Sequence, residues 1–189
     1  MLANPQIQNI TVFTDASFCH ETKAAGGAFW ARGDVARAQA AFPIEGAVHS
    51  HDAEVIAACE AILRLAAHPV IGKELEKGPE TRLVLVTDCQ TVQRALNQGR
   101  LATTSKDTKK IFAEVEALVK RWKFMLKVNH VKAHKGTATP RQWVNQWCDD
   151  QAGAHMRTLR TARRRLLNEQ KRAEKAAATA KAAQAQPTS

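Results

Sequence analysis

The sequence predicts an α/β domain with a mixed β-sheet, and three observations support this prediction. Three apolar runs near the N-terminus follow one another through short links, which is typical of an antiparallel meander. From Ser50 onward, apolar residues recur at helical spacing instead. A later run, residues 82–87, is almost continuously apolar, as expected of a parallel strand buried on both faces.

The predicted elements can be justified in chain order. Apolar and polar residues alternate over 10–15, Gly26 and Gly27 open a second run over 28–31, and the turn signal Gly33-Asp34 leads to a third strand ending over 41–44. The elements expected after this meander are a helix over 50–68, a surface connection over 70–80, a strand over 82–87, helices over 90–97 and 105–122, a strand over 125–131, a loop over 132–139, and a helix from Pro140.

The composition limits the class of protein. With 189 residues the chain can bury one domain core, and no apolar run is long enough to cross a bilayer. Its formal net charge of +10 indicates a polyanionic partner, nucleic acid before a membrane surface. The first six residues lack the features of a secretion signal, so we expect a cytoplasmic protein. We also expect a monomer. The four cysteines are too far apart to indicate a zinc cluster or a disulfide scaffold.

The positive charge is concentrated at the C-terminal end. From Arg157 onward there are nine lysines or arginines and two glutamates, and from Asn168 onward there is no large apolar side chain. We therefore divide the chain into an N-terminal extension (1–6), a folded domain (7–156) and a basic tail (157–189) that is solvated, partly helical or disordered. The tail either adds sequence-independent affinity for nucleic acid or only increases solubility.

Two of the predicted strands end in the same dipeptide, Thr14-Asp15 and Thr87-Asp88. Each would deliver a carboxylate to the carboxyl end of a strand, which is the edge where open α/β sheets bind ligands. The alternative is that both aspartates only cap the elements that follow them. The repetition favours a functional site.

Five motifs carry a resemblance to a known family. They are Thr14-Asp15-Ala16-Ser17, Ala53-Glu54, Thr87-Asp88-Cys89-Gln90, Val131-Lys132-Ala133-His134 and Cys148-Asp149. In order and spacing they resemble type 1 ribonuclease H over about residues 7–156. The resemblance implies a five-stranded mixed sheet flanked by helices, in which strands one to three are antiparallel and strands four and five lie parallel to strand one.

The resemblance also implies an activity, the endonucleolytic hydrolysis of the RNA strand of an RNA/DNA hybrid to give 5′-phosphate and 3′-hydroxyl ends. It implies that Asp15, Glu54, Asp88 and Asp149 hold two Mg²⁺ ions, with Mn²⁺ as an alternative. Oxygen ligands suit both of these hard cations. On the same basis His134 is expected to assist proton transfer or product release, unless it is only an exposed loop histidine.

Substrate contacts are expected from three places. Gln90 corresponds to a glutamine with which the family contacts nucleic acid, and Ser17 could approach a 2′-hydroxyl. Three lysines would follow a phosphate backbone, unless they form only a solvated helix face; they are Lys106, Lys109 and Lys110. The segment Ser50-His51-Asp52 departs from the asparagines that the family usually has before the helix glutamate, which leaves strand preference open.

Two other functions remain compatible with these residues. One is a different nuclease on the same fold, such as a junction resolvase or an exonuclease, because a fold alone does not define a substrate. The other is a catalytically silent nucleic-acid-binding module. The presence of all four carboxylates argues against a silent module.

Overall fold

The computed structural model describes residues 7–103, 105–131 and 139–184, with side chains up to residue 179. Its centre is a five-stranded sheet with the strand order β3-β2-β1-β4-β5. The strands are β1 (Gln8–Phe18), β2 (Ala25–Arg32), β3 (Arg37–Ile44), β4 (Thr81–Thr87) and β5 (Met125–His130). β1 and β3 are antiparallel to β2, whereas β4 is parallel to β1 and β5 is parallel to β4. This arrangement confirms the predicted ribonuclease H-like mixed sheet.

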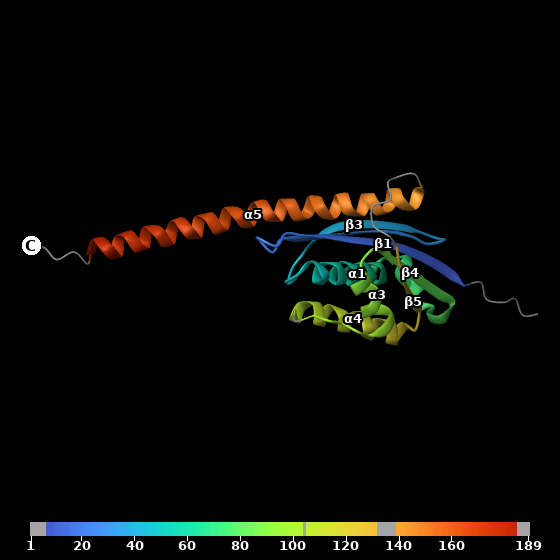
Figure 1. Ribbon diagram of the computed structural model, residues 1–189. Coiled ribbons are helices and arrows are strands. Elements are labelled where there is room, and N and C mark those ends of the chain that lie inside the picture. The colour runs from blue at the N-terminus through green and yellow to red at the C-terminus, as the bar shows by residue number, and fades with distance from the viewer. Residues whose placement is uncertain (1–6, 104, 132–138, 185–189) are drawn as a thin grey trace, which may run out of the picture.

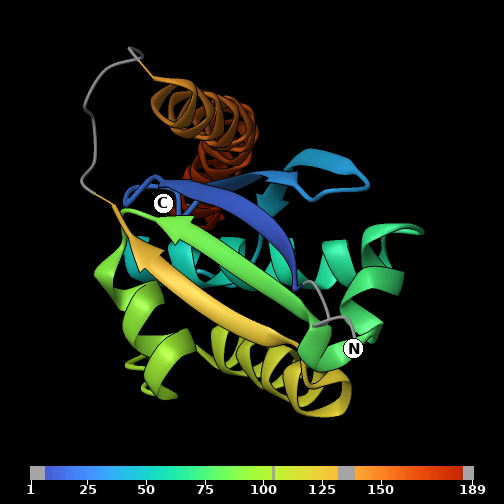
Figure 2. The same cartoon turned by 90° about the vertical axis from the view of Figure 1, so that its right-hand side faces the viewer.

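Helices cover both faces of the sheet, as Figure 2 shows. They are α1 (Ser50–Ala67), α2 (Ile71–Glu76), α3 (Gln90–Gln98), α4 (Lys106–Trp122) and α5 (Pro140–Gln184), with a short 3-10 turn at Gly78–Glu80. α5 lies on one face, and α1, α3 and α4 lie on the other. The larger part of the core includes Val12, Ile62 and Leu85, and a smaller cluster joins Phe13 to Cys148 of α5.

A glycine allows α5 to lie close to the sheet. Gly26 of β2 faces α5, and a Cβ atom at this position would lie 2.7 Å from the backbone nitrogen of Met156 and 2.8 Å from the Cβ atom of His155. Backbone atoms cannot move aside as a flexible side chain can, so only glycine fits here without displacing the helix. The position of α5 relative to β1 therefore depends on residue 26.

The C-terminal part of the chain is helical in the structure. α5 runs for 45 residues and crosses the predicted boundary between residues 156 and 157 without interruption. Figure 1 shows it extending well beyond the sheet. Alanine, glutamate, glutamine, lysine and arginine dominate this region, and all of them favour helix, which explains a helix without a core to pack against.

The segment 70–80 differs from the prediction of a simple surface connection. It forms α2 and the 3-10 turn, and Ile71 and Leu75 are fully buried. These two side chains are four residues apart, so one turn of helix places both of them against the core. Within the described part of the chain, no helix combines the length and the hydropathy needed to cross a membrane.

Candidate active site

Three carboxylates meet at the carboxyl end of the central strands. In the parallel ladder between β1 and β4, the last pair is Phe13 with Val86, and two residues further along each chain come Asp15 and Asp88. Glu54 reaches the same place from α1, and oxygen atoms of the three side chains all lie within 4.8 Å of one another. Asp15 does not end its strand as expected, because pairing with β2 extends β1 to Phe18.

Asp15 is buried in the site, Glu54 and Asp88 are half-buried, and the negative charges of the three side chains repel one another. Asp15 is only 7% exposed, and one of its oxygens, Oδ1, accepts a hydrogen bond of 2.8 Å from the backbone N–H of Ala16. Burial, followed by the negative charges of Asp88 and Asp149, raises the pKa of Asp15 from 3.8 to about 7, although the hydrogen bond from Ala16 acts in the opposite direction. Burial, followed by the charges of Asp15 and Asp88, also raises the pKa of Glu54 well above its ordinary value.

The donor set fits a hard divalent cation. Glu54 Oε2 is fully buried, and no group among the described residues donates a hydrogen bond to it. A buried carboxylate oxygen without a donor is costly in a protein interior unless a cation is bound to it. Close carboxylates with raised pKa values are what a Mg²⁺ or Mn²⁺ ion would stabilise in their charged form.

Asp149 lies at the edge of this cluster. It is half-buried on α5 and does not belong to the group of oxygens within 4.8 Å, yet its charge raises the pKa of both Asp15 and Glu54. Gln146, one turn earlier on α5, donates a hydrogen bond of 3.3 Å to Asp149 Oδ2. The structure thus places the four predicted carboxylates around one point, three in close contact and the fourth beside them.

Two contacts from neighbouring backbone and side chains hold Asp88 in place. The Nε2–H of His130, at the end of β5, donates a hydrogen bond of 2.8 Å to the carbonyl oxygen of Asp88. Thr87 Oγ1 accepts a hydrogen bond of 3.1 Å from the N–H of Cys89, which shapes the turn that follows β4. No sequence signal distinguished His130 from the other histidines, because its contact depends on the pairing of β4 with β5.

A hollow of about 480 Å³ adjoins the carboxylates. Residues from the start of α1 and the start of α3 line it, and they are Ser50, His51, Glu54, Asp88, Cys89, Gln90, Thr91 and Arg94. Gln90 therefore lies beside the carboxylates. Sequence reasoning missed Arg94, which donates a hydrogen bond of 3.4 Å to Gln90 Oε1. Its position one helical turn after Gln90 was a usable signal.

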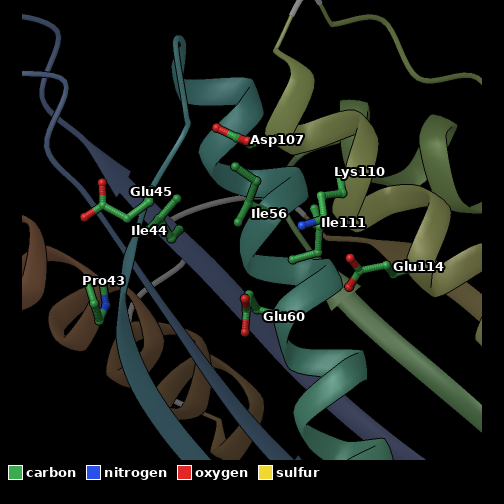
Figure 3. Close-up of a pocket in the computed structure, with 9 residues that line it drawn as sticks. All are labelled: Pro43, Ile44, Glu45, Ile56, Glu60, Asp107, Lys110, Ile111 and Glu114. Carbon is green, nitrogen blue, oxygen red and sulfur yellow. The ribbon is translucent and has the colours of Figure 1, made fainter.

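The other predicted contact residues lie further out or cannot be placed. Ser17 is half-buried near the end of β1, and Lys106, Lys109 and Lys110 are exposed on α4. His134 lies outside the described residues. Lys110 lines a second hollow of about 450 Å³ between β3, α1 and α4 (Figure 3).

This second hollow is acidic. Its lining includes four carboxylates against the single ammonium group of Lys110, and they are Glu45, Glu60, Asp107 and Glu114. Two of these carboxylates are ion-paired, Glu45 with Arg163 and Glu60 with Arg64. Asp107 and Glu114 still outnumber Lys110, so the hollow does not favour a phosphate backbone. The hollow therefore gives no support to a substrate contact through Lys110.

The sheet order, the helices on both faces and the carboxylates at one sheet edge define an RNase H-like protein. The sequence model of the RNase H family matches residues 7–157, which is most of the chain. The chain therefore belongs to the RNase H family, as its motifs predicted. Among curated proteins, no sequence matches it.

Several solved structures share the fold at low sequence identity. LC11-RNase H1, isolated from compost by a metagenomic approach, matches with a TM-score of 0.59 and 15% identity over 80% of this chain and 97% of that one. RNase H1 from the archaeon Halobacterium salinarum matches with a TM-score of 0.56 and 17% identity over 79% of this chain and 98% of that one. A structure of LC11-RNase H1 in complex with an RNA/DNA hybrid matches with a TM-score of 0.52 and 17% identity over 75% and 97% of the two chains.

Proposed function

We propose that this protein is an endoribonuclease that hydrolyses the RNA strand of RNA/DNA hybrids and leaves 5′-phosphate and 3′-hydroxyl ends. The observation that carries the proposal is the convergence of the buried Asp15 with the half-buried Glu54 and Asp88 at the carboxyl ends of β1 and β4. Membership of the RNase H family supports it, as does the similar fold of a protein solved with such a hybrid. We further propose that the protein is a monomer and that it is located in the cytoplasm.

The carboxylates would hold two Mg²⁺ ions, or Mn²⁺ ions, with Asp149 as the fourth ligand. When bound, two such ions supply an activated water and stabilisation of the departing ribose 3′-oxygen. The chain's own part is to keep the ligands fixed. Ala16 orients Asp15 through its N–H, His130 holds the backbone at Asp88, and Gln146 holds Asp149. His134 is proposed to move a proton or release product.

Groups beside the carboxylates are suited to holding the scissile strand. The hollow next to Glu54 and Asp88 offers the amide of Gln90 and the guanidinium of Arg94, so a ribose hydroxyl and a phosphate both find partners there. Ser17, two residues after Asp15 on β1, is a further proposed contact. Contact with a 2′-hydroxyl is how such a site would select RNA over DNA.

A substrate panel tests the proposal. Purified protein is given RNA/DNA, RNA/RNA, DNA/DNA and four-way-junction substrates of matched sequence, each with Mg²⁺, Mn²⁺ or a chelator, and the product ends are identified. We expect cleavage of the hybrid RNA strand only, and only with metal. Cleavage of junctions or of DNA would show another nuclease, and no cleavage of any substrate would show a silent binding module.

A variant of the site separates chemistry from binding. Asp15→Asn removes one charge from the carboxylate cluster and keeps the size of the side chain. We expect it to abolish cleavage and to leave hybrid binding largely intact in a filter or anisotropy assay. Unchanged turnover would contradict the assignment of Asp15 as a metal ligand.

A further inference from the structure

The outer half of α5 carries a set of cations that share one side of the helix. An α-helix has 3.6 residues per turn, so residues 11 apart lie almost in line along its surface. Asp149, Arg160 and Lys171 have this spacing. Three further cations, Arg157, Arg164 and Lys175, lie within a fraction of a turn of the same line. We call the five cations from Arg157 to Lys175 on this side the basic stripe.

The basic stripe begins beside the carboxylate cluster and leads away from it. Cys148, the residue before Asp149, contacts the carbonyl oxygen of Phe13, two residues before Asp15, so Asp149 lies on the part of α5 that is next to the cluster. The charge of Asp149 acts on both Asp15 and Glu54, which agrees with this placement. Cys148 Sγ lies 3.6 Å from the Phe13 carbonyl oxygen, and further along the helix Arg163 reaches the carbonyl oxygens of Thr22 and Lys23. α5 therefore follows β1 toward its carboxyl end, and Figure 1 shows it continuing beyond that edge.

Contacts at the sheet edge fix the direction of the extension. Arg163 Nη1 donates a hydrogen bond of 2.6 Å to the carbonyl oxygen of Lys23, and its Nη2 forms an ion pair of 2.7 Å with Glu45. Arg164 pairs with Glu21 in the turn after β1. Beyond these anchors, Lys171 and Lys175 are exposed, and no ion pair to either is found among the described residues.

We infer that the basic stripe binds the phosphate backbone of a nucleic-acid duplex and extends the binding surface beyond the carboxylate cluster. From Asp149 to Lys175 the helix rises about 40 Å, which equals about twelve base pairs. Charge complementarity favours nucleic acid, and the lack of large apolar side chains after Leu167 disfavours a membrane surface, which needs an apolar face. The position of the duplex over the carboxylate cluster rests on the proposed function. The binding of a duplex to the basic stripe does not.

The test compares two double variants of the full-length protein that lose the same charge. Lys171→Gln with Lys175→Gln removes the outer end of the basic stripe. Arg165→Gln with Arg172→Gln removes two cations that lie about a quarter to a third of a turn from the stripe, of which Arg165 is ion-paired with Glu169. Glutamine favours helix, and the helical content of both variants is checked by circular dichroism.

Binding to a 24-base-pair RNA/DNA hybrid and to DNA of the same sequence is measured by anisotropy in chelator over a range of salt concentrations. Affinity falls as salt rises, and each lost phosphate contact makes the slope of log affinity against log salt less steep by about 0.9. Over the tenfold range from 1 M to 0.1 M salt, this corresponds to about an eightfold smaller gain in affinity. For the stripe variant we expect a slope that is less steep by about 2 than that of the wild-type protein. Its affinity at 0.1 M salt should be up to about sixtyfold lower. We expect the control variant to remain near the wild-type protein.

Three outcomes would overturn the inference. An unchanged slope in the stripe variant would show that these lysines do not contact phosphates. Equal losses in both variants would show a non-directional charge effect. Binding of the wild-type protein to vesicles containing anionic lipid, with no binding to either duplex, would assign the stripe to a membrane surface. Because the assay contains no metal and measures no cleavage, it remains decisive if the chain cleaves another substrate or none.

Discussion

The stability of the metal-free protein should depend on pH through Asp15. In the unfolded chain this carboxyl has a pKa of 3.8, and in the folded protein about 7. Between these values the folded state binds more protons than the unfolded state, so the free energy of unfolding decreases as pH rises through this window. Removing the negative charge at residue 15 should therefore stabilise the metal-free protein at alkaline pH.

The size of the effect follows from the two pKa values. A pKa difference of about three corresponds to about 4 kcal/mol once pH exceeds both values. At pH 5.5 only about 2 kcal/mol of this cost is present, because the folded state is still largely protonated. The free energy of unfolding of Asp15→Asn relative to the wild-type protein should therefore increase by about 2 kcal/mol when the pH is raised from 5.5 to 8.5.

Urea unfolding in chelator, followed by circular dichroism at both pH values, measures this difference. Titrating groups distant from residue 15 are common to the two proteins, so they cancel in the comparison. Glu54 does not cancel, because the charge of Asp15 raises its pKa in the wild-type protein, and loss of this charge in the variant acts in the same stabilising direction. Adding Mg²⁺ at pH 8.5 should stabilise the wild-type protein and have a smaller effect on the variant, because a ligand of the folded state stabilises according to its affinity. A difference between the two proteins that does not change with pH would refute the reasoning.

Three further outcomes follow from single contacts. Gly26→Ala should lower the free energy of unfolding by about 1–3 kcal/mol in urea titrations, because the new methyl group meets the backbone of α5. Arg94→Ala should raise the KM for a hybrid roughly fivefold with little change in kcat, since it removes an exposed contact worth about 1 kcal/mol; an equal fall in kcat would contradict a binding role. Thr103→Val should cost about 1–3 kcal/mol in thermal unfolding, because Thr103 Oγ1 donates a hydrogen bond to the buried carboxylate of Asp52.

Much of the fold could be predicted because its signals are local. The meander, the helical period after residue 50 and the buried parallel strand each depend on residues close together in the chain, and the repeated Thr-Asp pair pointed to one sheet edge. The short helix α2 was missed because two buried side chains, Ile71 and Leu75, are too few to define a period. For the C-terminal region, composition alone did not distinguish a helix from a disordered chain.

The supporting contacts of the site could not be predicted, since they join segments that are distant in sequence. His130 meets Asp88 only because β5 pairs with β4, and Thr103 reaches Asp52 from the segment before α4. Glu54 was identified through a family motif, because nothing in its helix alone shows that it faces two strand ends. Such contacts depend on the packing of elements against one another, which a one-dimensional pattern does not encode.

α5 connects the two proposed functions of the chain. The same helix brings Asp149 to the carboxylate cluster and carries the basic stripe, and its position depends on the close approach at Gly26 and on the ion pair between Arg163 and Glu45. A displacement of α5 would therefore move a metal-ligand candidate and the duplex-binding cations together. It follows that Gly26→Ala should reduce both hybrid cleavage and duplex affinity, whereas Lys171→Gln with Lys175→Gln should reduce affinity and leave the cluster intact.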